Sequence, residues 1–243
     1  MKSAAVLAAA GAGVALAQSP TSDIPAPAGT SLSPEPITVS GSFDGENFLY
    51  DRESVVCQEQ DETGTQDTIF ILEDGASISN VIIGPNQAEG IHCLGSCSIT
   101  NVWFQDVCED AITILGDGSS ATISGGGAFA ADDKIVQING VGVDVRIENY
   151  YIQDYGKLAR SCGNCSGNGG PRNIVIDNVV AKDGGVLCGI NTNYGDTCHI
   201  TNSCVDSGKS CDLYTGNDTG DEPDKIGSGP DGQFCTAEIT EDC

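Results

Sequence analysis

A repeat with a period close to 24 residues constrains the fold of this chain more than any other feature of its sequence. Six segments share an initial Ile and a short β-forming run, and most of them carry Asn two positions after the Ile. They are ISNVIIG from Ile78, ITNVWFQ from Ile99, ISGGGAF from Ile123, IENYYIQ from Ile147, IDNVVAK from Ile176 and ITNSCVD from Ile200. The intervals between them are 21, 24, 24, 29 and 24 residues. Such a period is typical of a solenoid, in which each coil pairs with the next.

The residues within the repeat select the β class. Short runs rich in Val and Ile alternate with Gly, Asp and Asn turns, and no helical period of useful length is present. Leucine-rich repeats have a similar length, but this chain contains too few leucines for their pattern. We therefore predict an all-β fold, a parallel β-solenoid. The recurrent Asn is expected to stack from coil to coil as a turn ladder with no binding role, at positions 80, 101, 149, 178 and 202.

The first 36 residues differ in composition from the repeats. Residues 1–17 have Lys2, an apolar run of small residues and "ALA" before Gln18, which is the pattern of a secretory signal peptide cleaved after Ala17. This run is too short to span a membrane, and no later stretch qualifies. Residues 18–36 are rich in Pro and Ser and are expected to form a flexible leader. Residues 37–243 are expected to form the β-helix domain of a secreted, extracellular protein.

Twelve cysteines follow the leader, and an even number in a secreted chain predicts up to six disulfides. The "CGNC" segment at 162–165 is interpreted as a structural disulfide, although redox or zinc chemistry is an alternative. Asn164 and Asn217 lie in glycosylation sequons. The last forty residues are polar and acidic, so we expect disulfide-tied loops there and assign them no chemistry.

The formal net charge of −25, from 35 acidic and 10 basic residues, excludes the function classes that need a basic face. Nucleic acid is therefore not an expected partner, and no membrane contact is expected. An acidic substrate requires a divalent cation to bridge the like charges. We expect a monomer.

Stacking of the coils converts sequence offset into columns in space, with neighbouring coils about 4.8 Å apart. The residue eleven positions after each anchor Ile is Glu89, then Asp110, then Lys134. The next coil has Leu158 at this offset, beside Lys157. Each member comes before an apolar run, so the column is expected at a turn edge.

Two more charged residues flank this column: Glu109 precedes Asp110, and Arg160 follows Lys157 by three residues. The column with its flanks thus includes three of only ten basic residues in the chain. A surface ion-pair ladder of little energetic value is the alternative to a functional site. Asp132 and Asp133 also flank Lys134, and we interpret them as a solvated turn, with cation or substrate binding as the alternative.

Three carboxylates within about 5 Å of one another need a proton or a cation between them. Oxygen ligands suit Ca²⁺, so we predict that Glu89, Glu109 and Asp110 bind it. Zinc is disfavoured because His92 and His199 lack a metal-ligand spacing; both are expected to be packed, hydrogen-bonded residues within strands.

A cation beside basic groups suits removal of a proton next to a carboxylate, because the cation stabilises the developing negative charge. We assign Lys134 as the base, with Lys157 and Arg160 binding the substrate carboxylate or stabilising charge, and the two lysines exchangeable in role. Arginine suits bidentate carboxylate binding better than proton abstraction.

These residues also lie in longer motifs: NVIIGPNQAEGIHC, NVWFQDVCEDA, GGGAFAADDKIVQING, YGKLARSCGNC and GINTNYGDT. From about Gly41 to Asp206 the chain closely resembles the pectate lyases of polysaccharide lyase family three. The resemblance implies a right-handed parallel β-helix and Ca²⁺-dependent β-elimination on polygalacturonate. Its motifs imply the same six residues: Glu89, Glu109 and Asp110 as calcium carboxylates, and Lys134, Lys157 and Arg160 as catalytic cations.

Three positions depart from the family pattern. Ile138 stands where His is frequent, Ala159 where an aromatic residue is frequent, and Glu89 where Asp is common. The first two changes are expected to alter substrate contacts, and the third to shift calcium affinity. Two other functions stay open: a polygalacturonan hydrolase, which would use paired acids without Lys or Arg, and a non-catalytic, calcium-dependent binder of acidic polysaccharide. A lyase for methyl-esterified pectin is disfavoured because esterification removes the carboxylates that calcium would bridge.

Overall fold

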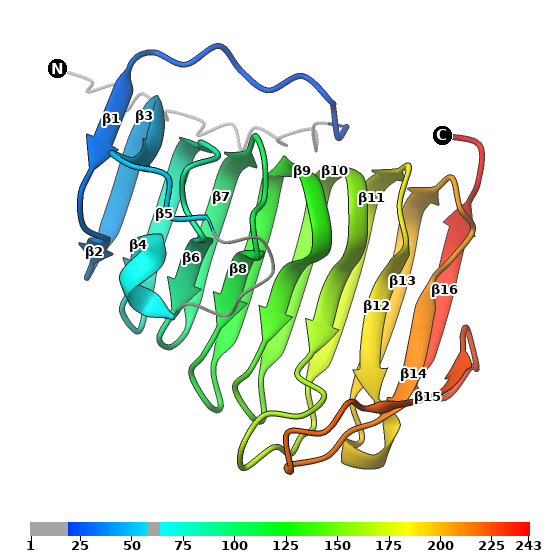
Figure 1. Ribbon diagram of the computed structural model, residues 1–243. Coiled ribbons are helices and arrows are strands. Elements are labelled where there is room, and N and C mark those ends of the chain that lie inside the picture. Colours follow the sequence, from blue (N-terminus) through cyan, green and yellow to red (C-terminus); the bar gives the residue numbers. More distant parts are fainter. Residues whose placement is uncertain (1–18, 58–63) are drawn as a thin grey trace, which may run out of the picture.

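A computed structural model describes residues 19–57 and 64–243, which fold into a right-handed parallel β-helix (Figure 1). The fold class predicted from the repeat is confirmed. In chain order the elements are β1 Thr30–Ser33, β2 Ile37–Val39, β3 Ser42–Arg52, η1 Thr65–Asp67, β4 Thr68–Leu72, β5 Ala76–Ile83, β6 Glu89–Cys93, β7 Cys97–Phe104, β8 Asp110–Ile114, β9 Ser120–Ile138, β10 Asp144–Ser161, β11 Asn173–Lys182, β12 Val186–Asn191, η2 Thr192–Tyr194, β13 Thr197–Val205, β14 Cys211–Thr215, β15 Asp224–Ser228 and β16 Cys235–Thr240.

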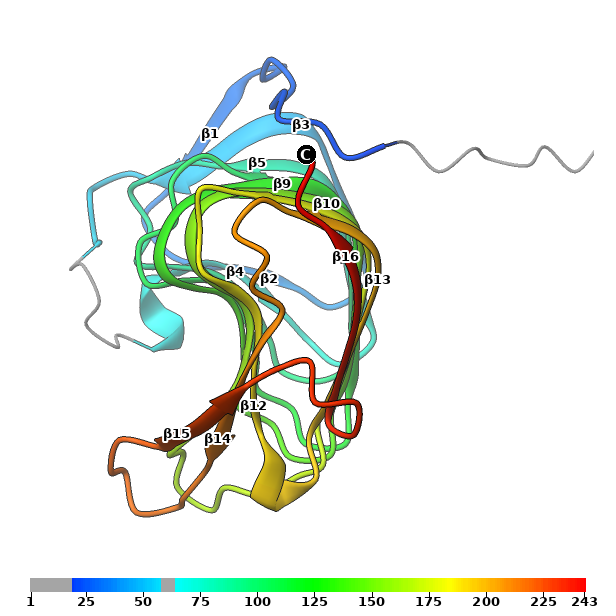
Figure 2. The same cartoon turned by 90° about the vertical axis from the view of Figure 1, so that its right-hand side faces the viewer.

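Two ladders of parallel strands run along the solenoid. The longer ladder follows the order β1-β3-β5-β7-β9-β10-β11-β13-β16, and β2-β4-β6-β8 form a second ladder that joins β9. The long strands β9 and β10 serve both ladders, because β10 also pairs with β12, which pairs with β14. Figure 2 shows the coils stacked around a common interior. The short β14–β15 pair is antiparallel and lies in the C-terminal loop region.

The anchor isoleucines of the six repeats form one continuous column in the core. Register pairs Ile78 with Ile99, Ile99 with Ile123, and so on through Ile147, Ile176 and Ile200. Each of these side chains is at most 1% exposed. Burial of such a side chain stabilises the folded state by about 1.5–3 kcal/mol, so the column contributes to the stability of every coil.

The recurrent Asn residues form the predicted ladder at a turn. All five have φ between 51° and 55°, a left-handed conformation that Asn tolerates better than most residues. The Asn101 side chain donates to Asn80 Oδ1 (2.9 Å), and that of Asn178 donates to Asn149 Oδ1 (2.8 Å). Gly125, also with a positive φ, occupies the turn between Asn101 and Asn149.

Disulfides tie the loops to the coils, as predicted. The six pairs are Cys57–Cys108, Cys93–Cys97, Cys162–Cys165, Cys188–Cys198, Cys204–Cys243 and Cys211–Cys235. The "CGNC" segment is therefore a disulfide, and two of the pairs, Cys204–Cys243 and Cys211–Cys235, lie in the last forty residues.

The N-terminal prediction requires one correction. Residues 30–33, which we expected in the flexible leader, form β1 and pair in parallel with Leu49–Arg52 of β3. Pro and Ser content does not reveal this strand because its partner at the sheet edge, rather than its own composition, stabilises it. The predicted signal peptide lies outside the described residues. Among those residues, no helix has the length and apolar character needed to cross a membrane.

Candidate functional site

The charged column predicted from the repeat period is present in the strand register. Glu89 at the start of β6 pairs with Asp110 at the start of β8, and Asp110 pairs with Lys134 of β9. One detail differs, because a register shift after Tyr155 brings Lys157 itself, rather than Leu158, opposite Lys134. A β-bulge of this kind cannot be counted from the repeat length. These three pairings thus place the acids and both lysines next to one another on successive coils.

Three carboxylates meet in a buried cluster. Oxygen atoms of Glu89, Glu109 and Asp110 all lie within 4.8 Å of one another, and each residue is only 2% exposed. Gly90 allows β6 and β8 to pack this closely, because a Cβ at Gly90 would collide with the backbone oxygen of Ala111 on the next coil. Glu109 follows Cys108, whose disulfide to Cys57 restrains this turn.

Glu89 is held in place by two neighbours that the sequence did not identify as partners. His92 Nε2 lies 2.7 Å from Glu89 Oε2, and Thr113 Oγ1 donates to the same oxygen at 3.4 Å. The prediction that His92 is a packed, hydrogen-bonded strand residue is confirmed. His199 is hydrogen-bonded to Thr236 Oγ1 at 2.7 Å, but it is exposed, so the prediction of packing was wrong for this residue.

Lys134 is the cation closest to the carboxylate cluster among the described residues. Its Nζ lies 3.2 Å from Glu109 Oε1, 3.4 Å from Asp110 Oδ1 and 2.6 Å from Asp133 Oδ2. Burial lowers the pKa of Lys134, but Asp110, Asp133 and Glu109 together raise that pKa above its usual value. Unless a cation offsets the charges of these three acidic residues, Lys134 is therefore fully protonated.

Asp133 connects the two lysines. One of its oxygens accepts from Lys134 and the other accepts from Lys157 Nζ at 3.0 Å. Burial raises the pKa of Asp133, but the two ammonium groups lower it further, and the net pKa lies below the usual value. The interpretation of residues 132–133 as a solvated turn was wrong, because both lie within β9; Asp132 is exposed there, and Asp133 pairs with both lysines.

Arg160 lies on the same strand as Lys157, but in a different column, opposite Gln137 and Gly189. Its Nη1 donates to the backbone oxygens of Ser161 (2.6 Å) and Gly189 (3.3 Å) and to Asn191 Oδ1 (3.1 Å). The guanidinium lies 4.1 Å from the centre of the Tyr214 ring. Burial lowers the pKa of Arg160, although arginine stays charged at any physiological pH.

The carboxylate cluster fits a hard divalent cation. Burial, together with the charges of Glu109 and Glu89, raises the pKa of Asp110 well above its usual value despite the opposing charge of Lys134. Asp110 Oδ1 accepts no hydrogen bond from any residue in 19–57 or 64–243. A set of carboxylate oxygens is the donor set that Ca²⁺ prefers. The other candidate group found in this part of the chain, Cys188, Cys198 and Cys211, consists of disulfide sulfurs and does not fit a metal.

A parallel β-helix that carries such acids beside lysines and an arginine defines the class of this protein as a polysaccharide lyase. The chain belongs to the pectate lyase family, whose sequence model matches residues 21–221. It is 52% identical over 187 residues to probable pectate lyase F of Aspergillus terreus, covering 76% of this chain and 79% of that protein. It is 47% identical over 209 residues to pectate lyase E of Emericella nidulans, covering 85% and 81%.

Solved structures agree with this assignment. The catalytic domain of pectate lyase PelI from Erwinia chrysanthemi superimposes with a TM-score of 0.72 at 27% identity, covering 88% of this chain and 97% of that domain. A structure of PelI in complex with tetragalacturonic acid has a TM-score of 0.70 at 27% identity, covering 88% of this chain and 69% of PelI.

Proposed function

We propose that this protein is a secreted enzyme that cleaves polygalacturonate by Ca²⁺-dependent β-elimination. The observation that carries the proposal is the register of Glu89, Asp110, Lys134 and Lys157, which places a buried acidic cluster next to two lysines. Membership of the pectate lyase family supports the reaction class. The tetragalacturonic acid bound to PelI supports an oligogalacturonate as substrate. The six disulfides support an oxidising, extracellular environment.

Glu89, Glu109 and Asp110 would hold the cation in this proposal. Bound there, Ca²⁺ would attract the substrate carboxylate, stabilise the negative charge that develops on it, and offset the carboxylates that raise the pKa of Lys134. His92 and Thr113 keep Glu89 oriented toward the cluster.

The basic residues would carry out the elimination. Lys134 removes the proton from C5 of a galacturonate unit. The electron pair of the C5–H bond forms the C4–C5 double bond as the C4–O glycosidic bond breaks, and the leaving oxygen takes up a proton from water. Lys157 and Arg160 bind the carboxylate of the substrate. This assignment needs a neutral Lys134, so it places the reaction at alkaline pH or with cations offsetting its acidic neighbours.

The product distinguishes the proposal from its alternatives. Polygalacturonate is incubated with the protein at alkaline pH, first with Ca²⁺ and then with EGTA, while ultraviolet absorbance and reducing ends are both measured. We expect an unsaturated, ultraviolet-absorbing product that EGTA abolishes. New reducing ends without this absorbance would mean hydrolysis. Retention of the polymer in calcium without any cleavage would mean a binding protein.

A second substrate tests the role assigned to the carboxylates of the polymer. Highly methyl-esterified pectin has few free carboxylates, so we expect much slower cleavage than with polygalacturonate at equal calcium concentration. Equal or faster cleavage of the esterified polymer would contradict calcium bridging.

A further inference from the structure

Arg160 is anchored through only one of its terminal nitrogens. Nη1 makes all three hydrogen bonds of the guanidinium to described residues, and two of their acceptors are backbone oxygens. The third acceptor is the side chain of Asn191, which is the last residue of β12 and is fully buried. Two backbone oxygens already accept hydrogen bonds from Nη1. The additional contact with the buried side-chain amide of Asn191 therefore requires an explanation.

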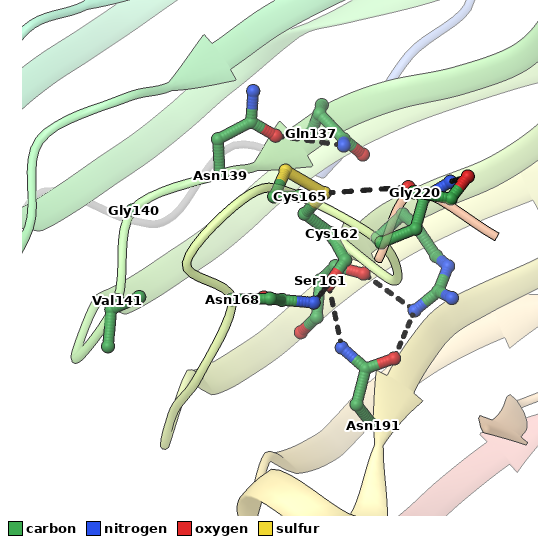
Figure 3. Close-up of a disulfide and its surroundings, with 12 residues drawn as sticks. Gln137, Asn139, Gly140, Val141, Ser161, Cys162, Cys165, Asn168, Asn191 and Gly220 are labelled. Carbon is green, nitrogen blue, oxygen red and sulfur yellow. Dashed lines mark hydrogen bonds between the residues drawn. A yellow bond between two sulfur atoms is a disulfide. The ribbon is translucent and has the colours of Figure 1, made fainter. Parts of the chain in front are cut away.

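Asn191 is itself held rigidly on its other side. Its Nδ2 donates to the backbone oxygen of Cys162 (2.9 Å) and to Asp196 Oδ2 (3.2 Å). Asp196 also accepts from the backbone nitrogens of Asn191 (3.0 Å) and Arg172 (2.9 Å). Figure 3 shows Asn191 facing the segment that carries Ser161 and Cys162. The amide therefore presents its oxygen in one fixed direction, toward Arg160.

Two further residues fix the plane of the guanidinium. Tyr214 on β14 lies 4.1 Å from Arg160 on one side, at stacking distance. Gly189 leaves space for the rest of the side chain, because a Cβ there would lie 2.6 Å from Arg160 Cδ and 3.3 Å from Nε. The arginine thus lies in a slot formed by β12 and β14.

The opposite edge of the guanidinium has different surroundings. Nε and Nη2 donate to no residue within 19–57 or 64–243, so this edge retains two parallel donors. Nη2 lies against Gly163, where a Cβ would be only 2.6 Å away. Two parallel N–H groups are the geometry that binds a carboxylate in a bidentate manner. A lysine could not reproduce this arrangement, because its ammonium is a single point charge.

We propose that Asn191 and Tyr214 are positioning residues that fix Arg160 so that its Nε and Nη2 edge binds a uronate carboxylate. This inference rests on the proposed function, since it assigns the substrate group that Arg160 recognises. Asn191 sets the rotation of the guanidinium through Nη1, and Tyr214 sets its plane. Both act on the substrate only through Arg160.

A double-mutant cycle tests this dependence. The wild type, Asn191→Ala, Arg160→Ala and the double variant are compared for kcat and KM in calcium-dependent elimination, and for oligogalacturonate affinity by calorimetry. We expect Asn191→Ala to lower kcat/KM roughly 10- to 100-fold, mainly by raising KM. In the Arg160→Ala background the same substitution should have less than about a twofold effect.

Controls separate positioning from general loss of stability. Ser203→Ala removes a buried hydroxyl that accepts a hydrogen bond from Val179 N. Ser203 is not on a strand position paired with Arg160. The substitution should therefore lower the melting temperature without changing KM. If Asn191→Ala does not fold, Tyr214→Phe and Tyr214→Leu supply the comparison, because Phe keeps the stacking face and Leu removes it. We expect near wild-type KM for the first and a raised KM for the second.

The outcomes distinguish the inference from the proposed function. Multiplicative losses in the double variant, or equal KM values for the two Tyr214 variants, would overturn the inference while an active wild type leaves the function intact. A wild type with neither elimination nor oligogalacturonate binding would overturn both.

Discussion

Asp110 and Lys134 are paired in register on neighbouring coils, with Lys134 Nζ 3.4 Å from Asp110 Oδ1. The residue proposed to bind calcium and the residue proposed to remove the proton are thus adjacent in one column. The charge state of each depends on the other, and calcium is expected to act on both.

Calcium should stabilise the folded protein through the acidic cluster. At about 100 times the dissociation constant, a ligand that binds only the folded state adds about 2.7 kcal/mol to the free energy of unfolding. We expect the melting temperature of the wild type to rise with calcium, and that of Glu109→Gln or Asp110→Asn to stay constant. Glu148→Gln, a change to an acid that pairs with Arg146 away from the cluster, is the control and should keep the calcium response. Loss of the response in this control, or its persistence in the cluster variants, would contradict the site.

The stability of the calcium-free protein should depend on pH through Asp110. Its pKa is higher in the folded state than in the unfolded state, chiefly because of burial. Between the two values the folded state binds more protons, so the free energy of unfolding falls as pH rises through this window. We expect this decrease in urea unfolding experiments in EGTA at a series of pH values, and a smaller decrease for Asp110→Asn. The same slope in both proteins would show that Asp110 is not responsible.

The two lysines should have separable kinetic effects. At saturating calcium, Lys134→Ala should lower kcat by roughly 10²- to 10⁴-fold, the usual contribution of a general base. Lys157→Ala should mainly raise KM, because Lys157 is assigned to substrate binding. Lys209→Ala changes an exposed lysine outside the cluster and serves as the control. A larger loss of kcat in Lys157→Ala than in Lys134→Ala would exchange the two roles.

The Asn ladder should contribute to stability and not to activity. Asn101→Ala removes hydrogen bonds to Asn80 and Trp103 and puts Ala at a φ of 52°, so we expect a loss of about 1–3 kcal/mol in urea unfolding. Gly tolerates this φ, so Asn101→Gly should lower the free energy of unfolding by less than Asn101→Ala does. Activity per folded molecule should equal that of the wild type in both variants; a change in KM would indicate a binding role for the ladder.

Much of the fold and the site was predictable because a solenoid repeats one geometry. Equal offsets from the anchor isoleucines placed Glu89, Asp110 and Lys134 in one column, and the register confirms each of these pairings. The prediction was off by one residue at Lys157, since a bulge changes the offset within a coil. The strand over 30–33 was missed because its stability depends on β3.

Contacts that depend on side-chain direction were less accessible from the sequence. Asp133 lies next to Lys134 in the chain, but only its rotamer shows that it also pairs with Lys157. His92 contacts Glu89 from three residues further along the same strand, and the sequence repeat does not indicate this contact. Asn191 and Tyr214 reach Arg160 from two later coils, so no local motif connects them to it.

The central claim is that the buried carboxylates make elimination by this protein calcium-dependent. Its most direct test is the initial rate of formation of the unsaturated product from polygalacturonate, measured over a titration of free Ca²⁺ for the wild type and Asp110→Asn. We predict saturable activation of the wild type and no activation of the variant over the same range. Equal activation of both proteins, or full wild-type activity in EGTA, would contradict the account.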